Sequence, residues 1–171
     1  MNRIVNNAFA ELIGEALDRL PTGIGNRLRG THFFTGTSPI YAGLIEYTEA
    51  SLGRSFHTVW CCATPDNLTM LSKIRRQPTI IMPVFNDGRP LWVLPMIVLH
   101  ELGHVLDWML GESHIAEPIT KYALMDRGEA FAEAFTLWLN PGYSLYYELI
   151  RDEGVDMETL NLFRELEKLW R

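Results

Sequence analysis

The sequence predicts a single α+β domain over residues 1–171, with a small sheet and a helical C-terminal half. Short segments rich in β-branched and aromatic residues lie in the first half of the chain, which is typical of strands. Longer segments with apolar residues at helical spacing occupy much of the second half. A length of 171 residues suits one domain with a buried core, and no repeat or linker-like composition divides it.

The first predicted element is an amphipathic helix at residues 3–20, where apolar residues recur at a helical period with acidic residues between them. Pro21 and the glycines two and four residues later are expected to end this helix. Residues 31–35 favour a short strand because they are β-branched or aromatic and are followed by a turn sequence. Residues 40–54 fit either a helical turn or a strand.

Two further strands are predicted, at residues 55–62 and 79–85. Pro83 lacks a backbone N–H, which favours a position at the edge of the sheet for the second of them. The first strand ends in the adjacent pair Cys61 and Cys62, and neighbouring cysteines form a strained ring rather than a structural disulfide. We expect them to be reduced, buried strand residues, with a reactive or metal-binding pair as the alternative.

An apolar helix is predicted at residues 94–110, with Pro95 tolerated in its first turn and Gly111 ending it. Residues 112–126 are expected to form a connecting loop. Further helices are predicted to complete the chain at three places: residues 127–139, 144–152 and 156–170.

The composition is that of an ordinary globular protein, with 47% hydrophobic and 21% charged residues. The formal net charge of −6 predicts no nucleic-acid partner, because nucleic-acid-binding proteins usually present a basic stripe. No apolar run is long enough to span a membrane. The first residues lack the core of a signal peptide, so we expect a cytoplasmic protein unless a phage particle, lysis or a specialised secretion system exports it. The oligomeric state is left open.

The most informative segment of the chain is His100-Glu101-Leu102-Gly103-His104, within the predicted apolar helix. Two histidines four residues apart share one face of a helix and can bind a single metal ion. A glutamate beside the first histidine can take a proton from water at that metal. This arrangement is typical of a zinc-dependent peptidase.

A second motif begins 25 residues further on, in the segment Glu129-Ala130-Phe131-Ala132-Glu133-Ala134-Phe135. Catalytic zinc sites usually have three protein ligands, and we predict Glu129 as the third. Glu133, one helical turn later, is predicted to accept a hydrogen bond from the free ring nitrogen of a ligating histidine. A solvated acidic face is the alternative for such a pair, but the surrounding alanines and phenylalanines favour burial.

The segment of residues 91–141 resembles the catalytic core of the gluzincin metallopeptidases, and most closely the group that contains the catalytic domain of anthrax lethal factor and the secreted Pro-Pro endopeptidases. The resemblance rests on the two motifs, on Asp107, and on Tyr122, which stands seven residues before Glu129. It implies a zincin-like fold, with the small sheet packed on the metal-binding helix. It also implies zinc bound by three residues, His100, His104 and Glu129.

The resemblance further implies a hydrolase, a zinc metalloendopeptidase that acts on a protein or peptide substrate. Glu101 would be the general base, and Tyr122 would assist the transition state by donating a hydrogen bond to the oxyanion. The strand at residues 79–85, if it lies at the sheet edge, would hold the substrate extended through backbone hydrogen bonds.

Other residues near the motifs have more ordinary interpretations. Asp107 shares the face of the two histidines; it either orients a ligand or pairs with Arg127, and it is poorly placed to bind the same zinc. Gly103 is expected to permit close helix packing. His114 is either simply exposed or a substrate contact. The metzincin pattern does not fit, because the positions that it reserves for a glycine and a third ligand hold Asp107 and Leu110.

The main alternative to a peptidase is a metal-stabilised, non-hydrolytic binding or regulatory module, such as a phage or mobile-element protein. The short chain and the absence of a signal peptide or a pro-segment favour this alternative. A toxin-like effector delivered into another cell is a third possibility, although no delivery domain is recognised.

Overall fold

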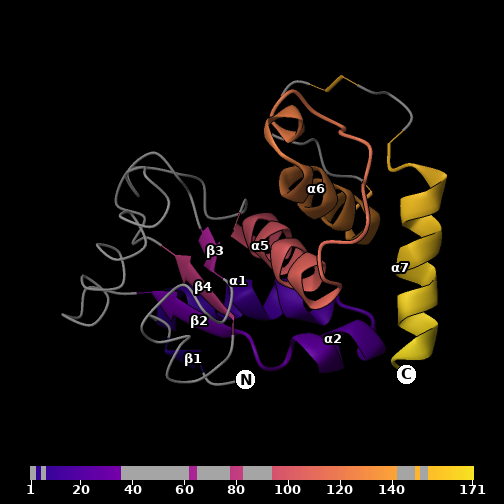
Figure 1. The fold of residues 1–171 in the computed structure, drawn as a ribbon. Coiled ribbons are helices and arrows are strands. Elements are labelled where there is room, and N and C mark those ends of the chain that lie inside the picture. The colour runs from indigo at the N-terminus through magenta and orange to yellow at the C-terminus, as the bar shows by residue number, and fades with distance from the viewer. Residues whose placement is uncertain are drawn as a thin grey trace.

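A four-stranded sheet lies beside a group of helices in the computed structural model of this chain (Figure 1). The combination confirms the predicted α+β class in its general form, although the described residues also form two helices in the first half of the chain. The structure describes the following residues: 3–4, 7–35, 62–64, 78–82, 94–141, 149–150 and 154–171.

The strands are β1 (Arg3–Ile4), β2 (His32–Thr35), β3 (Cys62–Thr64) and β4 (Thr79–Met82), arranged in the order β1-β2-β4-β3. β2 runs parallel to both β1 and β4, whereas β3 is antiparallel to β4. The strands predicted at residues 31–35 and 79–85 are thus confirmed at residues 32–35 and 79–82, and residues 83–85 lie outside the described residues. Most of the strand predicted at residues 55–62, including Cys61, lies outside the described residues, as does the ambiguous segment 40–54.

The predicted edge position of β4 is wrong, because β4 pairs with β2 on one side and with β3 on the other. The physical reason is the position of Pro83, which follows the last strand residue, Met82. A missing N–H at residue 83 removes no hydrogen bond from the ladder of residues 79–82. Pro83 therefore does not indicate whether β4 lies at the edge or in the middle of the sheet.

The N-terminal helix is shorter than predicted: α1 spans Asn7–Asp18, and the residues before it include strand β1. A second helix, α2 (Thr22–Leu28), was not predicted, since Pro21 and two glycines were expected to stop helical structure there. Pro21 instead takes the N-cap position, where its missing N–H costs nothing. A Cβ on Gly23 would lie 2.7 Å from the carbonyl carbon of Trp170, so this glycine permits a tertiary contact.

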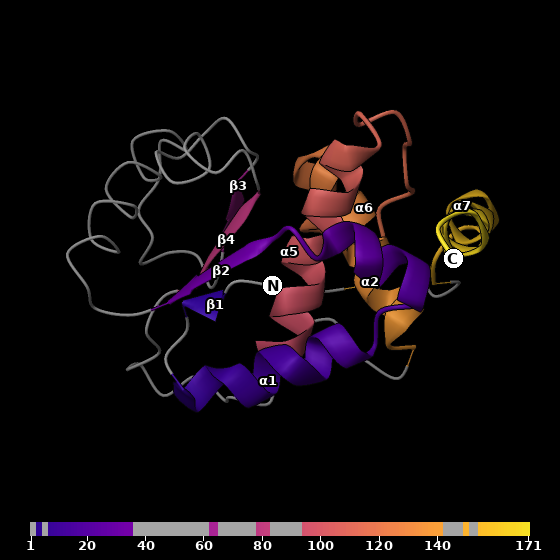
Figure 2. The ribbon, with the colours of Figure 1, turned by 90° about the horizontal axis from the view of Figure 1, so that it is seen from below.

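The long helix α5 (Leu94–Met109) lies at the centre of the molecule, between the sheet and α6 (Arg127–Leu139) (Figure 2). It contacts α1, α6 and β3. Its mostly apolar sequence follows from this position, because a helix covered on several sides needs apolar residues all round. The described sheet contacts this helix through β3.

The loop between α5 and α6 and the last helix complete the described structure. The loop begins at Gly111, whose φ of +70° lies in the left-handed region that glycine adopts readily. It contains a 3₁₀ turn at Ala123–Met125. α7 (Met157–Leu169) confirms the helix predicted near residues 156–170 and runs along one side of the molecule (Figure 1).

The helix predicted at residues 144–152 is described only at residues 149 and 150, and these are not helical. Leu149 instead forms an antiparallel bridge with Thr120 in the loop before α6. Among the described helices, none is long and apolar enough to cross a membrane.

The hydrophobic core lies around α5 and α6. A Cβ on Gly103 would be 2.7 Å from the Cα atom of Ala132, so the two helices touch backbone to backbone, as the expected role of Gly103 requires. The largest buried side chains come from α1, α2, the sheet, α5, α6 and α7, and include Ile13, Ile24, Phe33, Leu99, Phe131, Phe135 and Phe163.

Candidate metal centre

His100 and His104 lie on one face of α5, where the helical period places residues four apart one above the other. Their ring centroids are 4.9 Å apart and the rings are nearly perpendicular. Both side chains are partly buried beneath α6. The indole of Trp108, one turn further on, stacks against the His104 ring at 6.2 Å and limits its movement.

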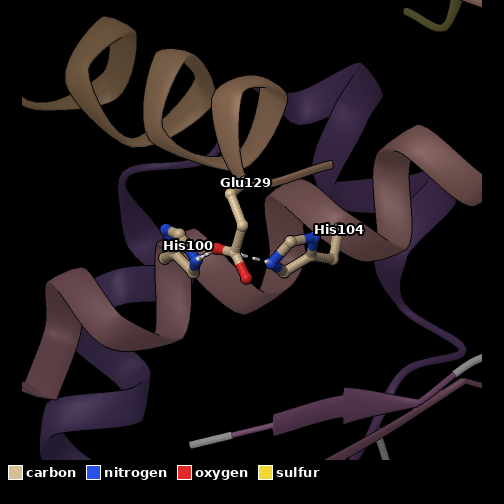
Figure 3. Close-up of side chains that lie close together, drawn as sticks. All are labelled: His100, His104 and Glu129. Carbon is tan, nitrogen blue, oxygen red and sulfur yellow. Dashed lines mark hydrogen bonds and ion pairs between the residues drawn. The ribbon is translucent and has the colours of Figure 1, made fainter. Parts of the chain in front are cut away.

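Glu129 extends from α6 to the space between the two imidazoles (Figure 3). Its Oε2 atom lies 3.0 Å from His100 Nε2 and 3.5 Å from His104 Nε2. Its other oxygen, Oε1, accepts a hydrogen bond of 3.0 Å from the Tyr122 hydroxyl. The carboxylate is therefore oriented, with one oxygen directed at both histidines and the other at the tyrosine.

These three residues could bind one metal ion. Their ligand atoms all lie within 4.8 Å of one another. In a tetrahedral zinc site, with ligands about 2.0–2.1 Å from the ion, neighbouring ligand atoms are about 3.3–3.4 Å apart. The two distances from Glu129 Oε2, 3.0 and 3.5 Å, lie on either side of that value. Two imidazoles and one carboxylate suit several divalent transition metals, including zinc.

The electrostatics of the cluster fit a preformed cation site. Burial raises the pKa of Glu129, but the hydrogen bonds and charges of the two histidines outweigh it and hold that pKa well below its usual range. Burial lowers the pKa of His100, but the hydrogen bond with Glu129 and the charges of Glu101, Glu129 and Glu133 together raise it above its usual value. Negative charge therefore surrounds the position that a cation would take.

The backbone of Glu129 is fixed by the start of α6. Asp126 is the N-cap residue, and its Oδ1 atom accepts a hydrogen bond of 3.1 Å from the Glu129 amide. Such caps satisfy a backbone donor that has no partner within the helix. Sequence reasoning missed Asp126, although an Asp three residues before a Glu at a helix start is a recognisable signal.

The two residues predicted to be catalytic come from different elements of the fold. Glu101 is buried on α5, directly after His100. Tyr122 lies in the loop before α6 and reaches the cluster through its hydrogen bond to Glu129. The structure thus brings Tyr122 to Glu129, as the resemblance to the gluzincins implies.

Glu133 bonds to a threonine, and not to a histidine ring as was predicted for it. Its Oε1 atom accepts a hydrogen bond of 2.7 Å from the Thr120 hydroxyl, while Oε2 is buried and has no hydrogen-bond partner among the described residues. The expected bond from a histidine ring to that oxygen is therefore not formed. Burial raises the pKa of Glu133, and the Thr120 hydrogen bond only partly offsets this effect. Sequence reasoning gave no signal for Thr120.

Asp107 pairs with Arg127, the first residue of α6, and is not directed at the cluster. Both guanidinium nitrogens contact the buried carboxylate, at 2.5 and 3.1 Å. Arg127 also donates to the carbonyl of His114 and lies 3.7 Å from the exposed Glu112. Of the two roles considered for Asp107, the ion pair is therefore confirmed, and this pair joins α5, α6 and the loop between them.

His114 is not simply exposed, because it is half-buried and bonds to α7. Its Nε2 atom lies 2.7 Å from the hydroxyl of Thr159 in α7, and its ring packs edge-on against Phe131. Asp156, the N-cap of α7, accepts hydrogen bonds from the Thr159 hydroxyl and from the Glu117 amide. These contacts anchor the loop on α7, so His114 has a structural role.

Comparisons of this chain with protein-family models, with curated proteins and with solved structures found no match in any of the three. The interpretation of the site therefore depends on its geometry and on the chemistry of its residues, and the resemblance to the gluzincins stays a prediction from the motifs.

Proposed function

We propose that this protein is a zinc-dependent metalloendopeptidase with a zincin-like, gluzincin-type catalytic site. The observation that supports this most directly is the position of the Glu129 carboxylate, with one oxygen facing both histidine Nε2 atoms and the other bonded to Tyr122. Two imidazoles and a carboxylate from two packed helices are the ligand set of many hydrolytic zinc enzymes. Glu101 and Tyr122 add the acid–base and hydrogen-bonding groups that peptide hydrolysis needs.

In this proposal His100, His104 and Glu129 hold the metal. Zinc supplies Lewis acidity, which polarises a peptide carbonyl and makes water a stronger acid. Glu101 takes a proton from the attacking water and passes it to the leaving amine. Tyr122 would donate a hydrogen bond to the oxygen on which negative charge develops, and for this its one hydroxyl proton must turn from Glu129 Oε1 to the substrate.

The strand that was predicted to bind the substrate, β4, cannot do so along residues 79–82, because it pairs with another strand on each side. In the described part of the sheet the outer strands are β1 and β3, and β3 is the one that contacts α5. We place an extended peptide substrate along β3, where backbone hydrogen bonds would fix its direction relative to the metal ligands.

The test compares wild type with Glu101→Gln, and uses Glu165→Gln, at an exposed position on α7, as the matched control. All three proteins are expected to bind about one zinc ion per chain, since none of the changes removes a ligand. Cleavage of a diverse peptide library should fall about 10²- to 10⁴-fold in Glu101→Gln alone. Zinc binding with no cleavage by wild type, or equal cleavage by Glu101→Gln, would contradict the proposal.

A second candidate function follows from the location of the cluster between two helices. A metal held by α5 and α6 also cross-links them, so it can serve a non-hydrolytic binding module as a structural element. In that case a partner protein would be retained uncut, equally well by wild type and by Glu101→Gln, and removal of zinc would lower the unfolding temperature and release the partner together.

A further inference from the structure

Two hydroxyls from one turn of the chain bond to two carboxylates on α6. The Tyr122 hydroxyl donates to Glu129 Oε1 at 3.0 Å, and the Thr120 hydroxyl donates to Glu133 Oε1 at 2.7 Å. Glu129 and Glu133 are one helical turn apart, so they lie on the same face of α6. The turn that carries the tyrosine is thus attached to α6 at two points.

The Thr120 hydroxyl makes a second contact within this turn. It accepts a hydrogen bond of 3.2 Å from the backbone amide of Ala123, which closes the chain around Tyr122. Thr120 is fully buried, and a hydroxyl has one proton to donate, which goes to Glu133. One buried hydroxyl therefore links the α6 carboxylate to the backbone on the far side of the tyrosine.

The backbone at the start of the same turn, at residues 119 and 120, is also held by residues 149 and 150. Thr120 forms a bridge with Leu149, and the carbonyl of Ile119 accepts a hydrogen bond of 2.9 Å from the Ile150 amide. Contacts with α6 and contacts with residues 149 and 150 thus both hold the start of the turn.

We propose that Thr120 and Glu133 are positioning residues for Tyr122, which set the place of its hydroxyl relative to the metal ligand Glu129. The inference rests on the proposed function, in which that hydroxyl assists hydrolysis. Glu133 Oε1 accepts from Thr120 whether or not the carboxyl carries a proton, so the contact does not depend on the ionisation of Glu133. In this role Glu133 acts on the tyrosine turn, where sequence reasoning placed it against a histidine.

The test removes the hydroxyl with Thr120→Val, which keeps the branched shape, and restores it with Thr120→Ser. The position of Tyr122 is followed by fluorine NMR of protein labelled with 3-fluorotyrosine, and Tyr122→Phe identifies its resonance. This readout needs neither zinc nor peptidase activity. Thr120→Val is expected to move the resonance towards that of an exposed tyrosine, and Thr120→Ser to return it to the wild-type position.

The same variants are then assayed with zinc and substrate. Thr120→Val should lower kcat about 10- to 100-fold, the size of effect that a misplacement of about 1 Å can produce. Zinc should still bind, because all three ligands remain, with at most the 10- to 100-fold loss of affinity that displacing a supporting group causes, so kcat is measured at saturating zinc. Thr120→Ser should recover most of the lost kcat. A merely structural role for Thr120 would lower stability and leave the tyrosine resonance and kcat unchanged.

Glu133→Met provides a second, independent variant, since it removes the acceptor and keeps the Thr120 hydroxyl. It must move the Tyr122 resonance in the same direction as Thr120→Val, whereas Glu133→Gln, whose amide oxygen still accepts, must not. If either removal leaves the resonance at its wild-type position, the inference is wrong. Failure of the proposed function would look different: wild type would cleave no peptide, while the resonance would still report on Thr120 and Glu133.

Discussion

Gly103 on α5 lies directly against Ala132 on α6: a Cβ on the glycine would be 2.7 Å from the Cα atom of the alanine. Real Cβ atoms essentially never approach so closely, and a backbone atom cannot swing aside as a flexible side chain can. Gly103 is the neighbour of His104, and Ala132 follows Glu129 by three residues. The contact therefore sets the separation between the histidine-bearing helix and the glutamate-bearing helix.

Gly103→Ala is accordingly expected to force α5 and α6 apart. Overpacking of this kind costs about 1–3 kcal/mol in the free energy of unfolding. The shift should also weaken zinc binding, because the ligand atoms sit on both helices. Urea unfolding of the zinc-free protein and a zinc titration measure the two effects.

The matched control is Gly14→Ala in α1, where an added Cβ would meet nothing within 4 Å. Alanine in a helix interior is favoured over glycine by about 0.5–1 kcal/mol, so this variant should be slightly more stable and bind zinc normally. Unchanged stability and zinc affinity in Gly103→Ala would show that the helix contact does not determine the site.

Glu129→Gln tests the third ligand. The amide can still accept from Tyr122, so the loop should stay in place, but the charge that faces the two histidines is lost. Removing even a group that only supports a ligand commonly costs 10- to 100-fold in metal affinity, so loss of a ligand should exceed about 100-fold. Competition with a chromophoric chelator measures this. Near-normal affinity would mean that the ion, if bound, takes other ligands.

The cluster of His100, His104 and Glu129 could be predicted from sequence because each step depends on local geometry. Helical spacing alone places His100 and His104 on one face, and the alanines and phenylalanines around Glu129 indicate a buried helix. A buried carboxylate requires a partner, and the histidine pair provides one. Tyr122 follows from its distance along the chain to Glu129, by analogy with the gluzincins.

The features that could not be predicted from the sequence depend on contacts between distant segments of the chain. The central position of β4 is set by its pairing with β2 and β3, and residues 79–82 contain no signal for it. Gly23 in α2 permits the close approach of Trp170, which lies far along the chain and which the local sequence does not indicate. The hydrogen bond from Thr120 to Glu133 joins a loop to a helix, and a threonine in a loop is too common to stand out.

The stability of the zinc-free protein should depend on pH through the ion pair in the cluster. The pKa of Glu129 is lowered from its usual value of 4.5, so its contribution is present above pH 4.5 and lost as the pH falls through the lower, folded-state value. The pKa of His100 is raised from 6.5, so its contribution is present below pH 6.5 and lost as the pH rises through the folded-state value.

The zinc-free protein should therefore be most stable in the acidic window between these two usual values, 4.5 and 6.5. The raised pKa of Glu133 acts in the same direction as that of His100: its contribution to stability is full below pH 4.5 and is lost as the pH rises, because burial makes the charged form costly. Zinc requires neutral imidazoles, so the stability that zinc adds should grow as the pH rises. Urea unfolding across pH, with chelator and with zinc, measures both trends, and an identical pH profile in Glu129→Gln would contradict the assignment.

Arg127→Met should destabilise the protein because it leaves the carboxylate of Asp107 buried without its cation. The Asp107 side chain is only 2% exposed, and breaking one side of such a pair costs about 3 kcal/mol or more. The double variant Asp107→Asn with Arg127→Met should recover part of that loss, since no buried charge remains. Arg164→Met, at an exposed position on α7, is the control and should change stability by less than about 0.5 kcal/mol. If the double variant lost as much free energy of unfolding as Asp107→Asn alone and Arg127→Met alone lose in sum, the two side chains would not stabilise each other.

Tyr122→Phe separates metal binding from catalysis. The variant loses the hydrogen bond to Glu129 Oε1, while Oε2, the oxygen that faces both histidines, keeps its position between them. Zinc binding should therefore persist, whereas kcat should fall about 10²- to 10³-fold, the usual effect of removing one donor to a developing oxyanion. KM should change little, because a donor that acts in the transition state contributes little to substrate binding.

Leu124→Ala is the control for Tyr122→Phe, since Leu124 is 62% exposed and lies two residues further along the same loop. It tests whether any change in this loop lowers the rate. Wild-type kcat in Leu124→Ala together with the loss in Tyr122→Phe assigns the effect to the hydroxyl. Equal kcat in all three proteins would remove Tyr122 from the mechanism, and loss of zinc from Tyr122→Phe would mean that the phenol acts by holding Glu129 and not by contacting the substrate.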